Sequence, residues 1–228
     1  MFRKSLKAAV SVLAAGTALT ACGPVKPGAA AVIGHDRITV AKLDSAVSQW
    51  KKELPKHPEA EQIMAASQPG REVPYDPSSP RRSALYQLIE IRAWQQLAKE
   101  KNLPLSQGQL DAFIASKGGR SGLDAYVLAE GLPTSYDDAF ARSLLIQQEL
   151  LRRSGVNPDQ PVTPQQQQVV TRLLAEYTTA KSHLNVTVNP RLGTFNRRTM
   201  KLGPVCPRLS TPDSGTSDGA TGEVKCQV

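Results

Sequence analysis

The stretch that decides the fold is residues 79–102, SPRRSALYQLIEIRAWQQLAKEKN. Ser79 followed by Pro80 is typical of a helix N-cap and first helical position, and Asn102 with Pro104 ends the helix. Its apolar residues lie on more than one face: Leu85, Leu88, Ile89, Ile91, Trp94, Leu97 and Ala98. A helix that is apolar on several sides packs on several sides. We therefore expect it to form the centre of the core.

The chain before this helix divides into a hairpin, a helix and a connector. Residues 30–38 predict a small strand pair that turns at Gly34. Thr39 then caps a helix whose apolar residues recur at spacings of three and four: Val40, Leu43, Val47, Trp50 and Leu54. Pro55 and Pro58 end that helix. Residues 55–79 hold five prolines and predict a connector that is mobile in part, with one short helix near residues 59–66.

The chain after the central helix has four further helical segments and one strand. Polar side chains at capping positions open three of the helices: Ser106 with Gln109, Ser135 with Asp138, and Thr163 with Gln166. A shorter helix ends at Gly131. Leu184, Val186 and Val188 then alternate with polar residues, which predicts a half-buried strand. The fold class is therefore mainly α, with a small strand pairing between the N- and C-terminal segments.

The first 21 residues have the pattern of an export signal, with basic residues before an apolar run over residues 8–19. That run is shorter than the roughly 20 residues that span a bilayer. Its small closing residues and Cys22 resemble the lipobox of bacterial lipoproteins. The resemblance implies cleavage before Cys22, lipid including palmitate on this cysteine, and anchoring to the extracytoplasmic face of a cell membrane. Ordinary secretion with a free Cys22 is the alternative. Residues 22–29 are a flexible tether.

The charge of the chain is mildly basic. Removing the three basic residues of the signal lowers the formal charge from +8 to +5, and export excludes nucleic acid as a partner. The basic pairs lie far apart: Lys51–Lys52, Arg81–Arg82, Arg152–Arg153 and Arg197–Arg198. A solvated helical surface explains them, and contact with anionic lipid or wall polymer near the anchor is the alternative.

Two cysteines besides Cys22 lie in the C-terminal tail, which we place at residues 197–228. An exported location permits a disulfide between Cys206 and Cys226, and free thiols are the alternative. The bridge would close a loop of about 20 residues and contribute about 3 kcal/mol. It is the one feature that would order this tail.

No pattern in the sequence points to catalysis. His35, His57 and His183 have no second ligand at a helical spacing, so we expect no metal site and no cofactor. Asp137 and Asp138 are interpreted as a favourable pair at a helix start. We therefore expect that the protein is not an enzyme.

The order of segments resembles the N-terminal domain of the SurA- and PrsA-type export chaperones. Residues 31–39, AVIGHDRIT, are similar to the opening hairpin and helix start of that family. Residues 85–90, LYQLIE, lead into residues 97–103, LAKEKNL, and residues 186–195, VTVNPRLGTF, are similar to its closing strand. The resemblance implies a helical, peptide-cradling domain over residues 30–196. Only residues 155–164 separate the last two helices, which leaves no room for the parvulin isomerase module.

The resemblance implies a chaperone-like domain that binds unfolded or newly exported polypeptides without isomerase activity. An envelope scaffold lipoprotein with one specific partner is the alternative, and an enzyme with a cryptic site is a third class. The large aromatic residues are candidates for a groove, with burial in the core as the competing interpretation: Trp50, Trp94, Tyr126, Tyr136 and Phe140. The ligand-binding residues and the oligomeric state stay open.

Overall fold

The computed structural model describes residues 27–66, 78–158 and 160–205. The elements follow in the order β1 (Ala29–Ile33), β2 (Asp36–Thr39), α1 (Val40–Glu53), η1 (Leu54–Lys56), α2 (Pro58–Ala66), α3 (Pro80–Glu100), α4 (Gln107–Ser116), α5 (Gly119–Ala129), η2 (Thr134–Tyr136), α6 (Asp137–Arg153), α7 (Pro164–Ser182), β3 (Val186–Val188), η3 (Pro190–Leu192), β4 (Thr194–Asn196) and β5 (Lys201–Gly203). The predicted fold class, mainly α with a small antiparallel sheet, is confirmed.

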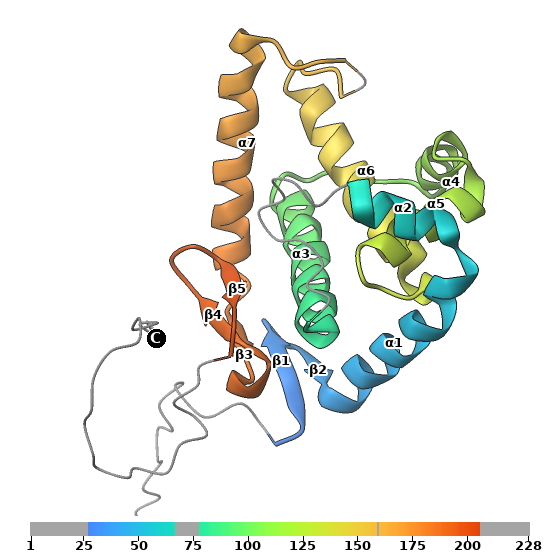
Figure 1. Ribbon diagram of the computed structural model, residues 1–228. Coiled ribbons are helices and arrows are strands. Elements are labelled where there is room, and N and C mark those ends of the chain that lie inside the picture. The colour runs from blue at the N-terminus through green and yellow to red at the C-terminus, as the bar shows by residue number, and fades with distance from the viewer. Residues whose placement is uncertain (1–26, 67–77, 159, 206–228) are drawn as a thin grey trace, which may run out of the picture.

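Helix α3 is the centre of the core, as predicted. It packs against α1, α6, α7 and β1, and Figure 1 shows it in the middle of the molecule. Leu85, Ile89 and Leu97 are almost completely buried although they do not share one narrow stripe. The helix therefore supplies side chains to more than one buried cluster, and the other helices are arranged around it.

The strand pairing between the two ends of the chain is also present. The sheet has the order β2-β1-β3 with both pairs antiparallel, and Ala31 lies opposite Val188. Asn189, directly after β3, donates its side-chain amide to the Ala29 carbonyl at 3.1 Å and its backbone N–H to the Ala30 carbonyl at 2.8 Å. Residues 159 and 160 positions apart are thus fixed side by side (Figure 1).

The region predicted as a connector contributes to the folded body. The short helix expected near residues 59–66 is α2, which packs against α5 and buries Ala60 completely. Leu54, Ile63 and Met64 cover the same small cluster. Residues 55–66 are therefore part of the fold, because α2 covers one end of α1 and α5; residues 67–77 lie outside the described residues.

The predicted start of the sixth helix is wrong in detail. Ser135 does not cap it, because Ser135 lies within η2 and α6 begins at Asp137 without a side-chain cap. The backbone N–H of Thr134 instead donates to the Glu53 carboxylate at 2.9 Å, and the Ser135 hydroxyl lies 3.4 Å from the Gln49 amide oxygen. The backbone N–H of Thr134 and the hydroxyl of Ser135 thus bind polar side chains of α1 instead of capping α6.

Ordered structure continues past residue 196, where we place the end of the helical domain from the sequence. Strand β5 pairs with β4, and Leu202 is only 7% exposed because it packs into the main core. Gly193, with a φ of 141°, allows this close packing, since a Cβ there would lie 2.5 Å from the Gly203 carbonyl oxygen.

No helix among the described residues has both the length and the apolar character needed to cross a bilayer.

Candidate functional site

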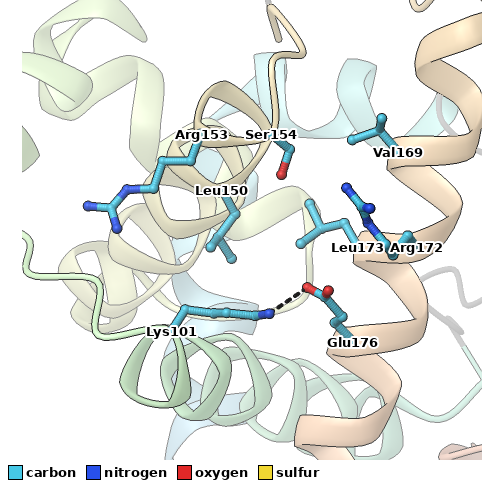
Figure 2. A pocket seen from close by; sticks show the side chains of 8 residues that line it. All are labelled: Lys101, Leu150, Arg153, Ser154, Val169, Arg172, Leu173 and Glu176. Atoms are coloured by element: carbon cyan, nitrogen blue, oxygen red, sulfur yellow. Dashed lines mark ion pairs between the residues drawn. The ribbon is translucent and has the colours of Figure 1, made fainter.

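An open pocket lies where the C-terminal end of α6 meets α7, beside the end of α3. Helices α6 and α7 both pack along α3 and are joined by residues 154–163 (Figure 1). The pocket has a volume of about 270 Å³ and is lined by Lys101, Leu150, Arg153, Ser154, Val169, Arg172, Leu173 and Glu176. All eight side chains are drawn in Figure 2. The pocket thus combines residues from three helical segments.

The floor of the pocket is apolar and its rim is charged. Leu150 and Leu173 form the buried floor, and Val169 is half-buried beside them. An ion pair of 2.9 Å between Lys101 Nζ and Glu176 Oε2 borders the side of the pocket that is at the bottom of Figure 2. In Figure 2 the Ser154 hydroxyl and the Arg172 guanidinium approach the opening from opposite walls. An apolar side chain could enter while polar groups around it meet the rim.

The turn between α6 and α7 is held by local hydrogen bonds. Thr163 and Gln166 form the predicted capping box, and the Gln166 side chain also lies 3.4 Å from the Gly155 carbonyl. Val156 is almost completely buried, and its N–H donates to the Leu151 carbonyl at 2.9 Å. Hydrogen bonds thus hold the described residues that follow α6 and precede α7 next to the two walls of the pocket.

A buried polar network fixes α7 against α3 below the pocket. Lys181, only 3% exposed, forms an ion pair with Glu90, and the Tyr177 hydroxyl donates to the other oxygen of the same carboxylate. Trp94 stacks on the Tyr177 ring with centroids 4.1 Å apart. Burial, followed by the charge and hydrogen bond of Glu90, raises the pKa of Tyr177, so this hydroxyl stays a donor. No local pattern in the sequence predicts this network, since Glu90 and Lys181 are 91 residues apart.

The aromatic residues considered for a groove do not line this pocket. Trp50, Trp94 and Phe140 are buried in the core, and Trp50 Nε1 donates to the Leu128 carbonyl at 2.8 Å. Tyr136 is half-buried at the start of α6, and Tyr126 is exposed on α5. The apolar residues that line the pocket are all aliphatic. The aromatic candidates from the sequence therefore do not contribute to ligand binding there.

A carboxyl pair between α5 and α6 was also not predicted. Asp137 is 9% exposed rather than a solvated helix-start residue, and its Oδ1 is buried without a hydrogen-bond partner among the described residues. The carboxyl of Asp124, on α5, lies close enough to interact with it electrostatically. Burial is the main effect that raises the pKa of Asp137 to about 8, and the neighbouring carboxyl of Asp124 is the second. Asp138 keeps the exposed position and forms a 2.6 Å ion pair with Arg120. The pair does not line the pocket.

The histidines lie apart from one another in the structure. His35 is exposed in the hairpin turn, His57 lies 3.3 Å from Glu59 Oε1, and His183 lies 2.8 Å from Glu100 Oε1. The hydrogen bond with His183, followed by that from Gln96, lowers the pKa of Glu100. Among the residues that the structure describes, no three His, Cys, Asp or Glu side chains form a group that could hold a metal ion.

The predicted lipidation and disulfide residues cannot be placed relative to the pocket. Cys22, Cys206 and Cys226 lie outside the described residues. Of the segments that carry the export-chaperone resemblance, residues 31–39 form the hairpin and end at Thr39, the N-cap of α1. Residues 186–195 form β3, η3 and the start of β4. No protein-family model, curated protein or solved structure matches this chain.

Proposed function

We propose that the protein is a membrane-anchored lipoprotein whose helical domain binds unfolded or newly exported polypeptides, and that it does so at the pocket between α6 and α7. The observation that carries the proposal is the open pocket with a floor of Leu150 and Leu173 and a rim of charged residues. Its volume of about 270 Å³ is below the roughly 300–1,000 Å³ typical of small-molecule sites. The pocket therefore suits one apolar side chain of a longer chain.

The rim favours an extended polypeptide over a purely apolar ligand. Arg172 and Ser154 offer donors to backbone carbonyls, and Glu176 offers an acceptor to N–H groups. Such groups recognise features that every polypeptide has, whereas the floor requires only an apolar side chain. Weak selectivity with modest affinity is what a binder of many unfolded clients needs.

The lipid anchor confines this activity to a membrane surface. The export signal, the small residues before Cys22 and the short tether support the proposed location on the extracytoplasmic face. Exported chains are unfolded when they emerge at that face. The resemblance of residues 31–39 and 186–195 to export chaperones supports the same class of client.

The test is the aggregation of an unfolded client in the presence of the mature chain, residues 22–228, carrying Cys22→Ser. We expect stoichiometric protein to suppress aggregation. Val169→Asp, in the pocket, should abolish suppression, whereas Leu174→Asp on the same helix should not, because Leu174 is 52% exposed and does not line the pocket.

Three outcomes would count against the proposal. Unchanged aggregation with the parent chain contradicts chaperone-like binding, and equal effects of the two substitutions contradict the assignment of the pocket. Circular dichroism of both variants checks that α7 stays folded. Capture of one dominant envelope protein, with no effect on unfolded clients, would instead favour the scaffold function.

A further inference from the structure

The surface at which the tether enters the fold is formed by elements that carry exposed basic residues. We name this surface the entry face and define it by Arg37, Lys42 and Arg191, all of which are exposed. Each residue is fixed near the first described residues, 27–30, by a different element. The entry face is thus a property of the fold and not of one charged segment.

Three sets of hydrogen bonds place these residues. The Arg37 guanidinium, on β2, donates to the Pro27 carbonyl. Lys42 lies in the first turn of α1, whose first N–H, from Val40, donates to the Gly28 carbonyl at 2.9 Å.

Arg191 follows β3 in η3, where its N–H donates to the Asn189 side chain at 3.1 Å. Asn189 itself donates to the carbonyls of Ala29 and Ala30. Residues 27–30 therefore accept hydrogen bonds from β2, from the start of α1 and from the residue that precedes η3. These are the three elements that carry the entry-face cations.

The local charge is positive and is not neutralised by neighbouring carboxylates. The nearby acids have other partners, since Asp36 pairs with Arg92 at 3.1 Å and Asp44 pairs with Arg81 at 2.7 Å. Within the part of the chain that the structure describes, no carboxylate forms an ion pair with an entry-face cation. Residues 186–205 hold four basic residues and no acidic one.

The length of the tether limits how far this face can lie from the lipid. Cys22 and Pro27 are joined by five Cα–Cα steps, which span at most about 18 Å when fully extended. A lipidated Cys22 lies at the membrane surface, so the entry face must lie close to it. Electrostatic attraction acts over about 8–10 Å at moderate ionic strength, which is about half of this maximum, so the tether allows the entry face to come within its range.

We propose that the entry face contacts anionic phospholipid headgroups and thereby orients the domain on its anchor. Figure 1 shows the turn between α6 and α7 at the opposite end of the molecule from the start of β1. Contact through Arg37, Lys42 and Arg191 consequently directs the α6–α7 pocket away from the membrane, where emerging chains can reach it. This inference rests on the proposed lipid anchoring, but its test needs neither lipid on Cys22 nor a client.

The test is co-sedimentation of the mature Cys22→Ser chain with millimolar lipid vesicles at low salt. We expect binding to vesicles of phosphatidylcholine and phosphatidylglycerol in a 7:3 ratio, and none to phosphatidylcholine alone. Each basic residue at an anionic surface strengthens partitioning about fivefold. The triple variant Arg37→Gln/Lys42→Gln/Arg191→Gln should therefore bind about a hundredfold more weakly.

A charge-matched control separates a specific face from net charge. The variant Lys99→Gln/Arg142→Gln/Arg152→Gln removes one lysine and two arginines from α3 and α6, away from the entry face. We expect its binding to change less than about threefold, because these groups lie beyond the screening length from an oriented surface. Equal losses in the two triple variants, or equal binding of the parent to neutral vesicles, would overturn the proposal. A failed client assay would leave this result unchanged.

Discussion

Replacing Glu90 with glutamine tests whether the network below the pocket fixes α7 on α3. The Glu90 carboxylate accepts from both Lys181 and Tyr177, and Lys181 is only 3% exposed. Glu90→Gln leaves the ammonium group buried without a countercharge, which costs about 3–5 kcal/mol in buried ion pairs. This is a large part of the roughly 5–15 kcal/mol that stabilises a domain. We expect the urea midpoint, followed by circular dichroism, to fall accordingly.

Two further variants separate the buried charge from general effects of substitution. Asp36→Asn breaks the exposed pair with Arg92, whose side chains are 61% and 50% exposed, and should cost less than about 1 kcal/mol. Glu90→Leu/Lys181→Met removes both charges and should be more stable than Glu90→Gln alone. A cost below about 1 kcal/mol for Glu90→Gln would refute the argument, as would a double variant that is less stable than the single one.

Three more predictions concern other elements of the fold. Burial and then Asp124 raise the pKa of Asp137 from 3.8 to about 8, so folded stability falls as pH rises through this range. Asp137→Asn should stabilise the protein in urea titrations at pH 8 but not at pH 4, and equal effects would contradict this. Thr163→Ala removes the cap of α7 and should lower the unfolding free energy by about 1 kcal/mol; no change would exclude a role for this cap. Gly193→Ala places a Cβ 2.5 Å from the Gly203 carbonyl and should lower the thermal midpoint, whereas an unchanged midpoint would show that β5 can shift without cost.

Local signals in the sequence predicted the helices well because the groups that start and end them are close in the chain. Thr39 accepts from the Lys42 N–H at 3.1 Å, and the capping boxes at Ser106 and Thr163 form as expected. Ser79 occupies the N-cap position of α3 but makes no side-chain capping hydrogen bond. Ser135 does not cap α6, and its partner on α1 is 86 residues away. Such a partner leaves no local pattern.

Features that depend on packing between distant segments were missed for the same reason. Leu202 lies in a short, weakly patterned segment, and its burial follows from the packing of the β4–β5 hairpin on the core. Asp137 has the sequence context of an ordinary helix start, and only the approach of α5 makes it a buried partner of Asp124.

The pocket itself could not be derived from periodicity. Leu150 and Leu173 have the spacing of ordinary core residues in their own helices. Their exposure to a common opening depends on how α6 and α7 pack around the end of α3. The tether and the lipidation of Cys22, in contrast, stay predictions that rest on one contiguous stretch of sequence.

Site-directed photocrosslinking tests the central claim most directly. The full-length protein, anchored through Cys22 in vesicles, would carry a benzophenone side chain at position 169 in the pocket or at position 174 outside it. With an unfolded exported client, we predict crosslinks from position 169, none from position 174, and none from either when the client is folded. Absence of crosslinks at position 169, or equal crosslinking from both positions, would contradict binding of unfolded chains at the α6–α7 pocket.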